Sequence, residues 1–134
     1  MRKIDMLQRA YMDIQAAKAI SVYEFSDELQ YDVLAYHVQQ SIEKLMKYEL
    51  ESSGIEYPFD HRVNILYELM ENNNLDPPKW IWQNRVILND YATLTRYGED
   101  MVTTKREAME LLEHSIKYYN DVQQKQQDLQ EEPD

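Results

Sequence analysis

The sequence has no cysteine and only two glycines among its 134 residues. Without cysteine there is no disulfide, no thiol nucleophile and no zinc site built on thiolates. A dinucleotide-binding G-x-G-x-x-G loop needs three glycines, and a G-x-x-x-x-G-K phosphate loop needs two glycines close together. Gly54 and Gly98 lie too far apart to form either loop. These absences exclude thiol enzymes and the common glycine-rich nucleotide sites.

Basic residues and long apolar runs are also scarce. The 14 Lys and Arg residues face 25 Asp and Glu residues, which leaves a formal net charge of -11. This field repels polyanions, so we do not expect non-specific binding to nucleic acid. No stretch approaches the ~18 uninterrupted apolar residues of a membrane span, and no apolar core of a signal peptide follows the basic start. We expect a cytoplasmic protein with no membrane contact.

The abundant Leu, Met, Gln, Glu and Lys residues favour helices. Apolar residues recur at spacings of three and four, which is typical of amphipathic helices. The predicted helices cover about 3–21, 27–52 and 61–72, a fourth from Asp76-Pro77 to a break over residues 95–102 around Gly98, and a fifth from Thr104. The expected N-caps are Ser26, Asp60, Asp76 and Thr104, with Glu107 completing a capping box and Gly54 ending the long second helix.

Short connections between such helices favour antiparallel neighbours. The predicted fold is therefore all-α, an antiparallel bundle of about five helices in a single domain. We expect the domain to cover residues 1–122 and residues 123–134 to form a polar, acidic, frayed tail. On the last helix we expect a buried side made of Ala108, Leu111, Leu112, Ser115, Tyr119 and Val122.

Three histidines and two tryptophans are the next residues with chemical potential. His37, His61 and His114 form no pair four residues apart and none follows a glutamate by three, so we expect no metal site and no cofactor. Trp80 and Trp82 point about 200° apart on a helix and cannot share one buried face. One of them is expected to meet another element or a partner chain, which favours a dimer.

Two polar groupings are candidate binding sites. His37, Gln40, Lys44 and Lys47 form a polar stripe on the predicted second helix, and the alternative is a solvated face. Arg96 stands beside Tyr97 where a helix ends. Its guanidinium can either cap helix carbonyls or present a planar cation to a phosphate or carboxylate.

Three sequence blocks resemble the HEPN domains (higher eukaryotes and prokaryotes nucleotide-binding). Residues 36–47, Y-H-V-Q-Q-S-I-E-K-L-M-K, resemble the aromatic-H-x-Q-Q-x-x-E-K-x-x-K signature. Gly54, Pro58 and His61 resemble the family's G…P…H-D-L pattern, and residues 91–100 resemble its Y-x-x-x-x-R-Y-P-x-D block. The blocks occur in the family's order within about residues 5–122. Gly98 replaces the usual proline, and Arg62-Val63 replace the usual Asp-Leu.

The resemblance implies an antiparallel helical bundle that dimerises. Many HEPN proteins are encoded beside a minimal nucleotidyltransferase and form a toxin–antitoxin-like pair with it. Some bind nucleotides, and many others are metal-independent ribonucleases with an Arg-x(4–6)-His motif. No arginine of this chain has a histidine at that spacing, and the nearest case is Arg106 with His114 eight residues later.

The resemblance without this motif implies a non-catalytic module that binds a nucleotidyltransferase partner or a nucleotide. It assigns no catalytic residue and no metal ligand, and the expected ligand contacts are Arg96, Tyr97, Lys44, Lys47, His61 and Gln40. One alternative is a ribonuclease that pairs Arg96 with His61 or His114, and another is a purely structural dimeric scaffold. In a structural role, Glu43 and Lys44 tie helices together while Gln39 and Gln40 satisfy buried backbone groups.

Overall fold

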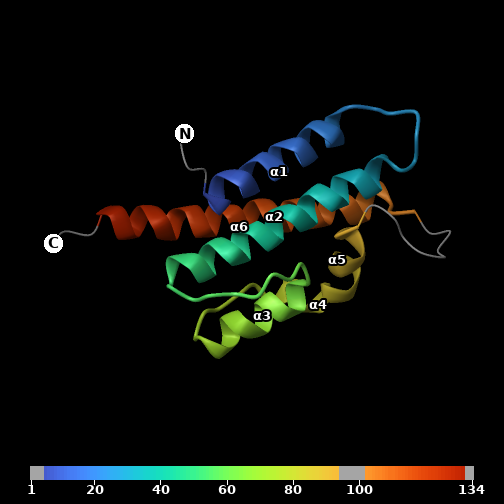
Figure 1. Ribbon diagram of the computed structural model, residues 1–134. Helices are drawn as coiled ribbons and strands as arrows, with labels where there is room; N and C mark the ends of the chain where they lie inside the picture. Colours follow the sequence, from blue (N-terminus) through green and yellow to red (C-terminus); the bar gives the residue numbers. More distant parts are fainter. Residues whose placement is uncertain (1–4, 94–101, 132–134) are drawn as a thin grey trace.

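The computed structural model describes residues 5–93 and 102–131, and six helices form its architecture (Figure 1). In chain order they are α1 (Met6–Val22), α2 (Gln30–Ser52), α3 (Val63–Asn72), α4 (Lys79–Gln83), α5 (Arg85–Tyr91) and α6 (Lys105–Glu131). No strand occurs in these two ranges. The predicted all-α, single-domain fold is confirmed, with one helix more than the five expected.

Helix α2 is the centre of the molecule. It packs against α1 and α6 on one side and against α3 and α5 on the other (Figure 1). Seven of its apolar side chains are fully buried: Leu34, Ala35, Val38, Ile42, Leu45, Met46 and Leu50. All six helices contribute to one continuous apolar core around this face. None of the helices in the described ranges has both the length and the hydropathy needed to cross a bilayer.

Two helix ends lie where the sequence predicts them, the end of α2 at Gly54 and the start of α6 at Thr104. Gly54 has a φ of 71°, and the N–H of Ile55 donates to the carbonyl of Leu50 at 2.9 Å, so a left-handed residue closes α2. Thr104 caps α6, because its Oγ accepts the Glu107 N–H at 3.1 Å. Both expectations are confirmed.

Three other expected helix starts are wrong. Ser26 does not cap α2, which begins at Gln30 after a connector in which Asp27 accepts the Leu29 N–H. Asp60 accepts the Arg62 N–H within the loop before α3 and not inside that helix. Asp76 does not start α4, which begins only after Pro78. Asp76 and Pro77 each precede a proline, and a proline disfavours the helical conformation in the residue before it.

The predicted fourth helix is divided and the last helix is extended. Asn84 separates α4 from α5, and this break gives the sixth helix. Helix α6 has 27 residues and continues to Glu131, so residues 123–131 are helical where the sequence predicted a frayed tail. It is therefore longer than α2, which has 23 residues. Glutamine, lysine and glutamate are good helix formers, which explains how α6 extends through a segment whose one apolar residue is the exposed Leu129.

Aromatic side chains anchor the smaller helices and α6. Trp80 stacks on His114 of α6 with ring centroids 4.8 Å apart, and Trp82 lies 5.3 Å from the ring of Tyr67 on α3. Each tryptophan thus meets another element of its own chain. Of the two adjacent tyrosines on α6, Tyr118 is buried in the core, whereas Tyr119, which was expected there, is only half-buried.

A core truncation in α2 tests the central position of this helix. Leu45→Ala removes a fully buried side chain, so the free energy of unfolding is expected to fall by about 2–5 kcal/mol. Urea unfolding followed by circular dichroism measures this change. The control is Val86→Ala on α5, which is exposed and should change stability by no more than about 0.5 kcal/mol. Equal effects of the two substitutions would contradict the described packing.

Candidate functional site

The glutamine-rich segment of α2 directs part of its polar face into the protein. Glu43 is 3% exposed and Lys47 is 8% exposed. Glu43 Oε1 accepts from Lys47 Nζ at 2.9 Å and lies 2.6 Å from His61 Nδ1. Gln39 Nε2 donates to Glu43 Oε2 at 3.3 Å and to the carbonyl of His61 at 3.5 Å. We call Gln39, Glu43, Lys47 and His61 the Glu43 cluster.

The loop between α2 and α3 closes the Glu43 cluster from outside. Lys47 Nζ lies 5.6 Å from the centre of the Tyr57 ring, and the Phe59 ring packs edge-on against His61 at 5.4 Å. The His61 side chain itself is 60% exposed. The cluster therefore has one solvent-accessible group, His61, in front of a buried carboxylate and a buried ammonium.

A second carboxylate engages the remaining part of the polar stripe. Asp13 of α1 pairs with Lys44 through Oδ2, and its Oδ1 lies 3.1 Å from His37 Nδ1. Burial raises the pKa of Asp13, but hydrogen bonds and charges from His37 and Lys44 outweigh burial and bring the pKa below its usual value of 3.8. This Asp13 cluster, made of Asp13, His37 and Lys44, links α1 to α2.

The structure divides the side chains that the sequence assigned to one ligand site. Lys44 pairs with Asp13, Lys47 and His61 pair with Glu43, and Gln40 donates to Gln39 Oε1 at 2.6 Å. The two lysines therefore face different carboxylates. Arg96 and Tyr97 lie outside the described residues, so their assignment as ligand contacts stays a prediction. The described contacts agree with the alternative in which Glu43 and Lys44 tie segments together.

The two histidines of the ribonuclease alternative belong to separate groups. His61 contacts Glu43, whereas His114 stacks on Trp80. No arrangement of three or more His, Asp or Glu residues within 5–93 and 102–131 has the geometry to hold a metal ion.

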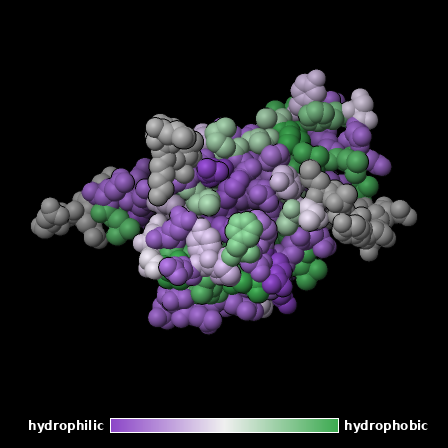
Figure 2. Space-filling view, viewed as in Figure 1, coloured by the Kyte–Doolittle hydropathy of each residue, from purple (hydrophilic) through white to green (hydrophobic). Residues whose placement is uncertain are grey.

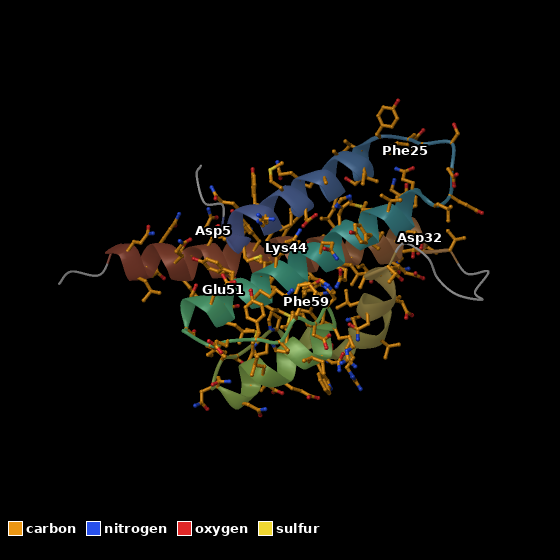
Figure 3. The ribbon with its side chains drawn as sticks, viewed as in Figure 1. Asp5, Phe25, Asp32, Lys44, Glu51 and Phe59 are labelled. Atoms are coloured by element: carbon orange, nitrogen blue, oxygen red, sulfur yellow. The ribbon has the colours of Figure 1, made fainter. Side chains whose placement is uncertain are left out.

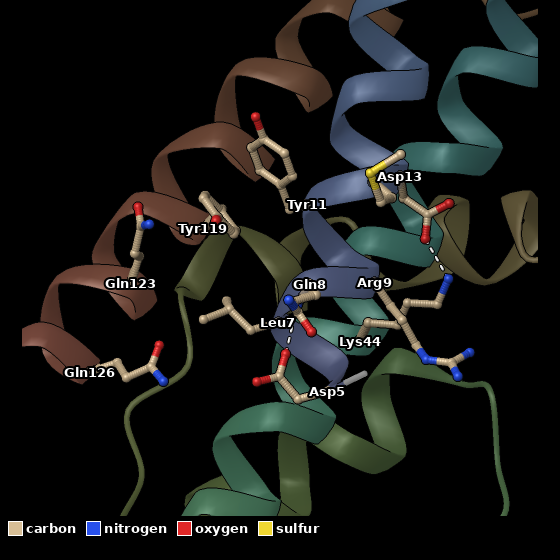
Figure 4. Close-up of a pocket in the computed structure, with 11 residues that line it drawn as sticks. Asp5, Leu7, Gln8, Arg9, Tyr11, Asp13, Lys44, Tyr119, Gln123 and Gln126 are labelled. Carbon is tan, nitrogen blue, oxygen red and sulfur yellow. Dashed lines mark hydrogen bonds and ion pairs between the residues drawn. The ribbon is translucent and has the colours of Figure 1, made fainter. Parts of the chain in front are cut away.

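A pocket of about 820 Å³ lies around the N-terminal half of α1, between α1, α2 and α6 (Figure 4). Tyr119 of α6 lies on one side of α1, with its ring centroid 5.5 Å from that of Tyr11, while Arg9 and Lys44 lie on the other side (Figure 4). Burial, with smaller contributions from Tyr11 and Asp5, raises the pKa of Tyr119 above 10.0. Of the expected ligand contacts that the structure describes, only Lys44 lines this pocket.

Sequence reasoning missed the other residues of this pocket. Arg9, Tyr11 and Tyr119 carry no motif, and their proximity depends on α1 lying beside α6. Tyr11 and Tyr119 lie on different helices, and a tyrosine on an amphipathic helix is normally a packing residue. No local signal in the sequence therefore identified either of them.

Removal of the Glu43 charge should destabilise the folded protein strongly. In Glu43→Gln the ammonium of Lys47 stays buried without a counter-charge, so the free energy of unfolding is expected to fall by about 3 kcal/mol. The matched control is Glu110→Gln, because Arg106 and Glu110 have the same four-residue spacing but are both exposed. That control should change stability by less than about 1 kcal/mol. Equal changes in the two urea-unfolding curves would show that burial of Glu43 does not matter.

The Asp13 cluster predicts that the free energy of unfolding decreases at acidic pH. Because the folded pKa of Asp13 lies below 3.8, its ionised form stabilises the fold, and this contribution is present above 3.8 and lost as the pH falls through the folded pKa. Asp13→Asn removes that dependence. Between roughly pH 6 and pH 3, the wild-type unfolding free energy should therefore decrease more than that of Asp13→Asn. Parallel pH profiles would contradict the pairing with His37 and Lys44.

Comparison with known proteins gives one match, which covers most of the chain. A family model of the HEPN domain matches residues 5–125, from the N-cap of α1 into the second half of α6. No curated protein and no solved structure matches significantly. The matched range includes the Glu43 cluster, the Asp13 cluster and all six helices in whole or in part. The chain belongs to the HEPN domain family.

Proposed function

We propose that this chain is a non-catalytic HEPN module that binds a minimal nucleotidyltransferase in a toxin–antitoxin-type pair. The observation that carries the proposal is the closed Glu43 cluster. Gln39 and Lys47 both donate to the Glu43 carboxylate, and Gln39 and Glu43 also bond to His61 of the loop before α3. The polar residues of the α2 signature therefore hold this helix to the loop before α3. Binding of the partner then takes place on the outer surface of the module.

The chemistry of catalysis supports the same conclusion. A general acid or base must come within hydrogen-bond reach of a substrate proton, directly or through one water. Glu43 and Lys47 are buried and engaged with each other. His61 is exposed, but the sequence holds no arginine at the ribonuclease spacing before any histidine. A ribonuclease would need Arg96 to join a histidine from another segment.

Nucleotide binding in the α1–α6 pocket is the second candidate. The volume of about 820 Å³ lies within the usual range for small-molecule sites. Tyr11 and Tyr119 offer aromatic faces for a base, and Arg9 and Lys44 offer cations for a phosphate. Lys44 is already compensated by Asp13, and the tyrosines lie across α1 from the cations (Figure 4). For this reason the partner-binding function ranks first.

Co-purification tests the proposal. The tagged chain is co-expressed with the product of the neighbouring reading frame, which the proposal expects to be a minimal nucleotidyltransferase, and light scattering measures the mass of the eluted complex. We expect a stable complex in which this chain is a homodimer. RNA incubated with the purified protein should stay intact.

Other outcomes identify the competing functions. RNA cleavage that disappears in Arg96→Ala would establish the ribonuclease alternative. Calorimetric heat with a panel of nucleotides that disappears in Arg9→Ala, without any transferase complex, would establish the nucleotide site. A homodimer with neither activity would leave the purely structural scaffold.

A further inference from the structure

Large apolar side chains gather at the outer end of the α1–α2 hairpin. Val22 is 85% exposed, Leu29 is 53% exposed and Phe25 is 50% exposed. We define the hairpin surface by six residues that share this end: the exposed Val22, Tyr23, Phe25, Leu29 and Val33 and the half-buried Ile20. Hydrophobic residues collect at this corner of the molecule, where α1 passes into α2 (Figure 2). An exposed apolar cluster of this kind marks an interaction site.

The connector that carries this surface is held in one conformation by Gln30. The Gln30 side chain is buried, and its amide donates to the carbonyls of Ile20 and Tyr23. Its Oε1 accepts the Phe25 N–H at 3.1 Å. The rings of Tyr23 and Phe25 pack with centroids 4.9 Å apart. Because the backbone is fixed before binding, a partner would lose little free energy in ordering it.

The hairpin surface contains a pocket of about 220 Å³. Ile20, Phe25, Leu29 and Val33 form most of its wall, and Asp27 and Gln30 also line it. Phe25 lies on the connector, away from the loop that carries Phe59 (Figure 3). The size and the apolar wall fit a single branched or aromatic side chain used as an anchor.

The connector itself carries only negative charge. No lysine or arginine occurs from residue 19 to residue 43. Glu24, Asp27 and Glu28 are all exposed on the connector. A second copy of this chain would bring the same carboxylates against them, and an anionic membrane surface would be repelled in the same way. The complementary surface is apolar at its centre and basic around it.

We propose that the hairpin surface docks a basic amphipathic segment of a partner protein. One apolar side chain of this segment enters the pocket beside Phe25 and Leu29, and its lysines or arginines face the carboxylates of the connector. The inference rests on the proposed function only in that it names the surface and the chemistry by which such a module would hold its partner.

Two synthetic amphipathic helical peptides test the docking surface directly. They share the same apolar positions, but one carries lysine and arginine at its polar positions and the other carries glutamate. Fluorescence anisotropy should show binding of the basic peptide alone, with an affinity that falls as salt is added. Amide NMR shifts should map the contact to residues 20–33. Equal binding of the two peptides, or shifts confined to other residues, would overturn the inference.

Substitutions separate the anchor from the charge. Phe25→Ala should weaken binding of the basic peptide about tenfold or more, and Glu28→Lys should weaken it in a salt-dependent manner. Val86→Ala is the control, because this exposed apolar residue lies on α5 outside the hairpin surface. Circular dichroism confirms that each variant is folded. Unchanged affinity in folded Phe25→Ala would overturn the inference.

The same variants distinguish the docking surface from the proposed function. A transferase complex that Phe25→Ala disrupts and Val86→Ala preserves supports both. A complex that survives in Phe25→Ala and Glu28→Lys overturns the hairpin inference and leaves the proposed function standing. Binding of the basic peptide without any transferase complex supports the inference and overturns the proposed partner.

Discussion

The buried carboxylate of Glu43 is the constraint on which the central part of the structure depends. An ionised carboxylate that is 3% exposed costs several kcal/mol unless charged or polar groups surround it. Here Lys47 and Gln39 come from the same helix face at four-residue spacing, while His61 comes from the following loop. Rotation of α2 or displacement of the loop would break the two bonds that join Glu43 and Gln39 to His61. The carboxylate therefore fixes the position from which α3 begins.

Asp13 has the corresponding role on the other side of α2. It lies on α1 and contacts Lys44 and His37 of α2, whereas Glu43 lies on α2 itself and contacts His61 of the loop before α3. The polar residues of the signature are thus shared between two neighbours of the same helix. Two of the eight lysines in this acidic chain are each paired with a carboxylate inside the bundle, so the net charge of -11 belongs to the rest of the chain.

Local signals in the sequence predicted the helices well and their junctions less well. Gly54 and Thr104 act on the residues beside them, so their roles could be recognised without a fold. Ser26 and Asp76 look equally good as caps, yet the connector bonded to Gln30 and the consecutive prolines displaced both helix starts. The outcome at these positions depends on residues that a cap motif does not include.

The candidate site shows the same division between local and distant causes. The sequence by itself determined a helical chain with apolar stripes, a polar signature on its second helix and no ribonuclease spacing, because these properties depend on composition and residue order. It could not determine whether the signature points to solvent or inward, because that direction depends on which segments cover the helix. Only the tertiary structure decided that Lys44 meets Asp13 and that Glu43 meets His61, because these pairs are 31 and 18 residues apart and packing alone brings them together.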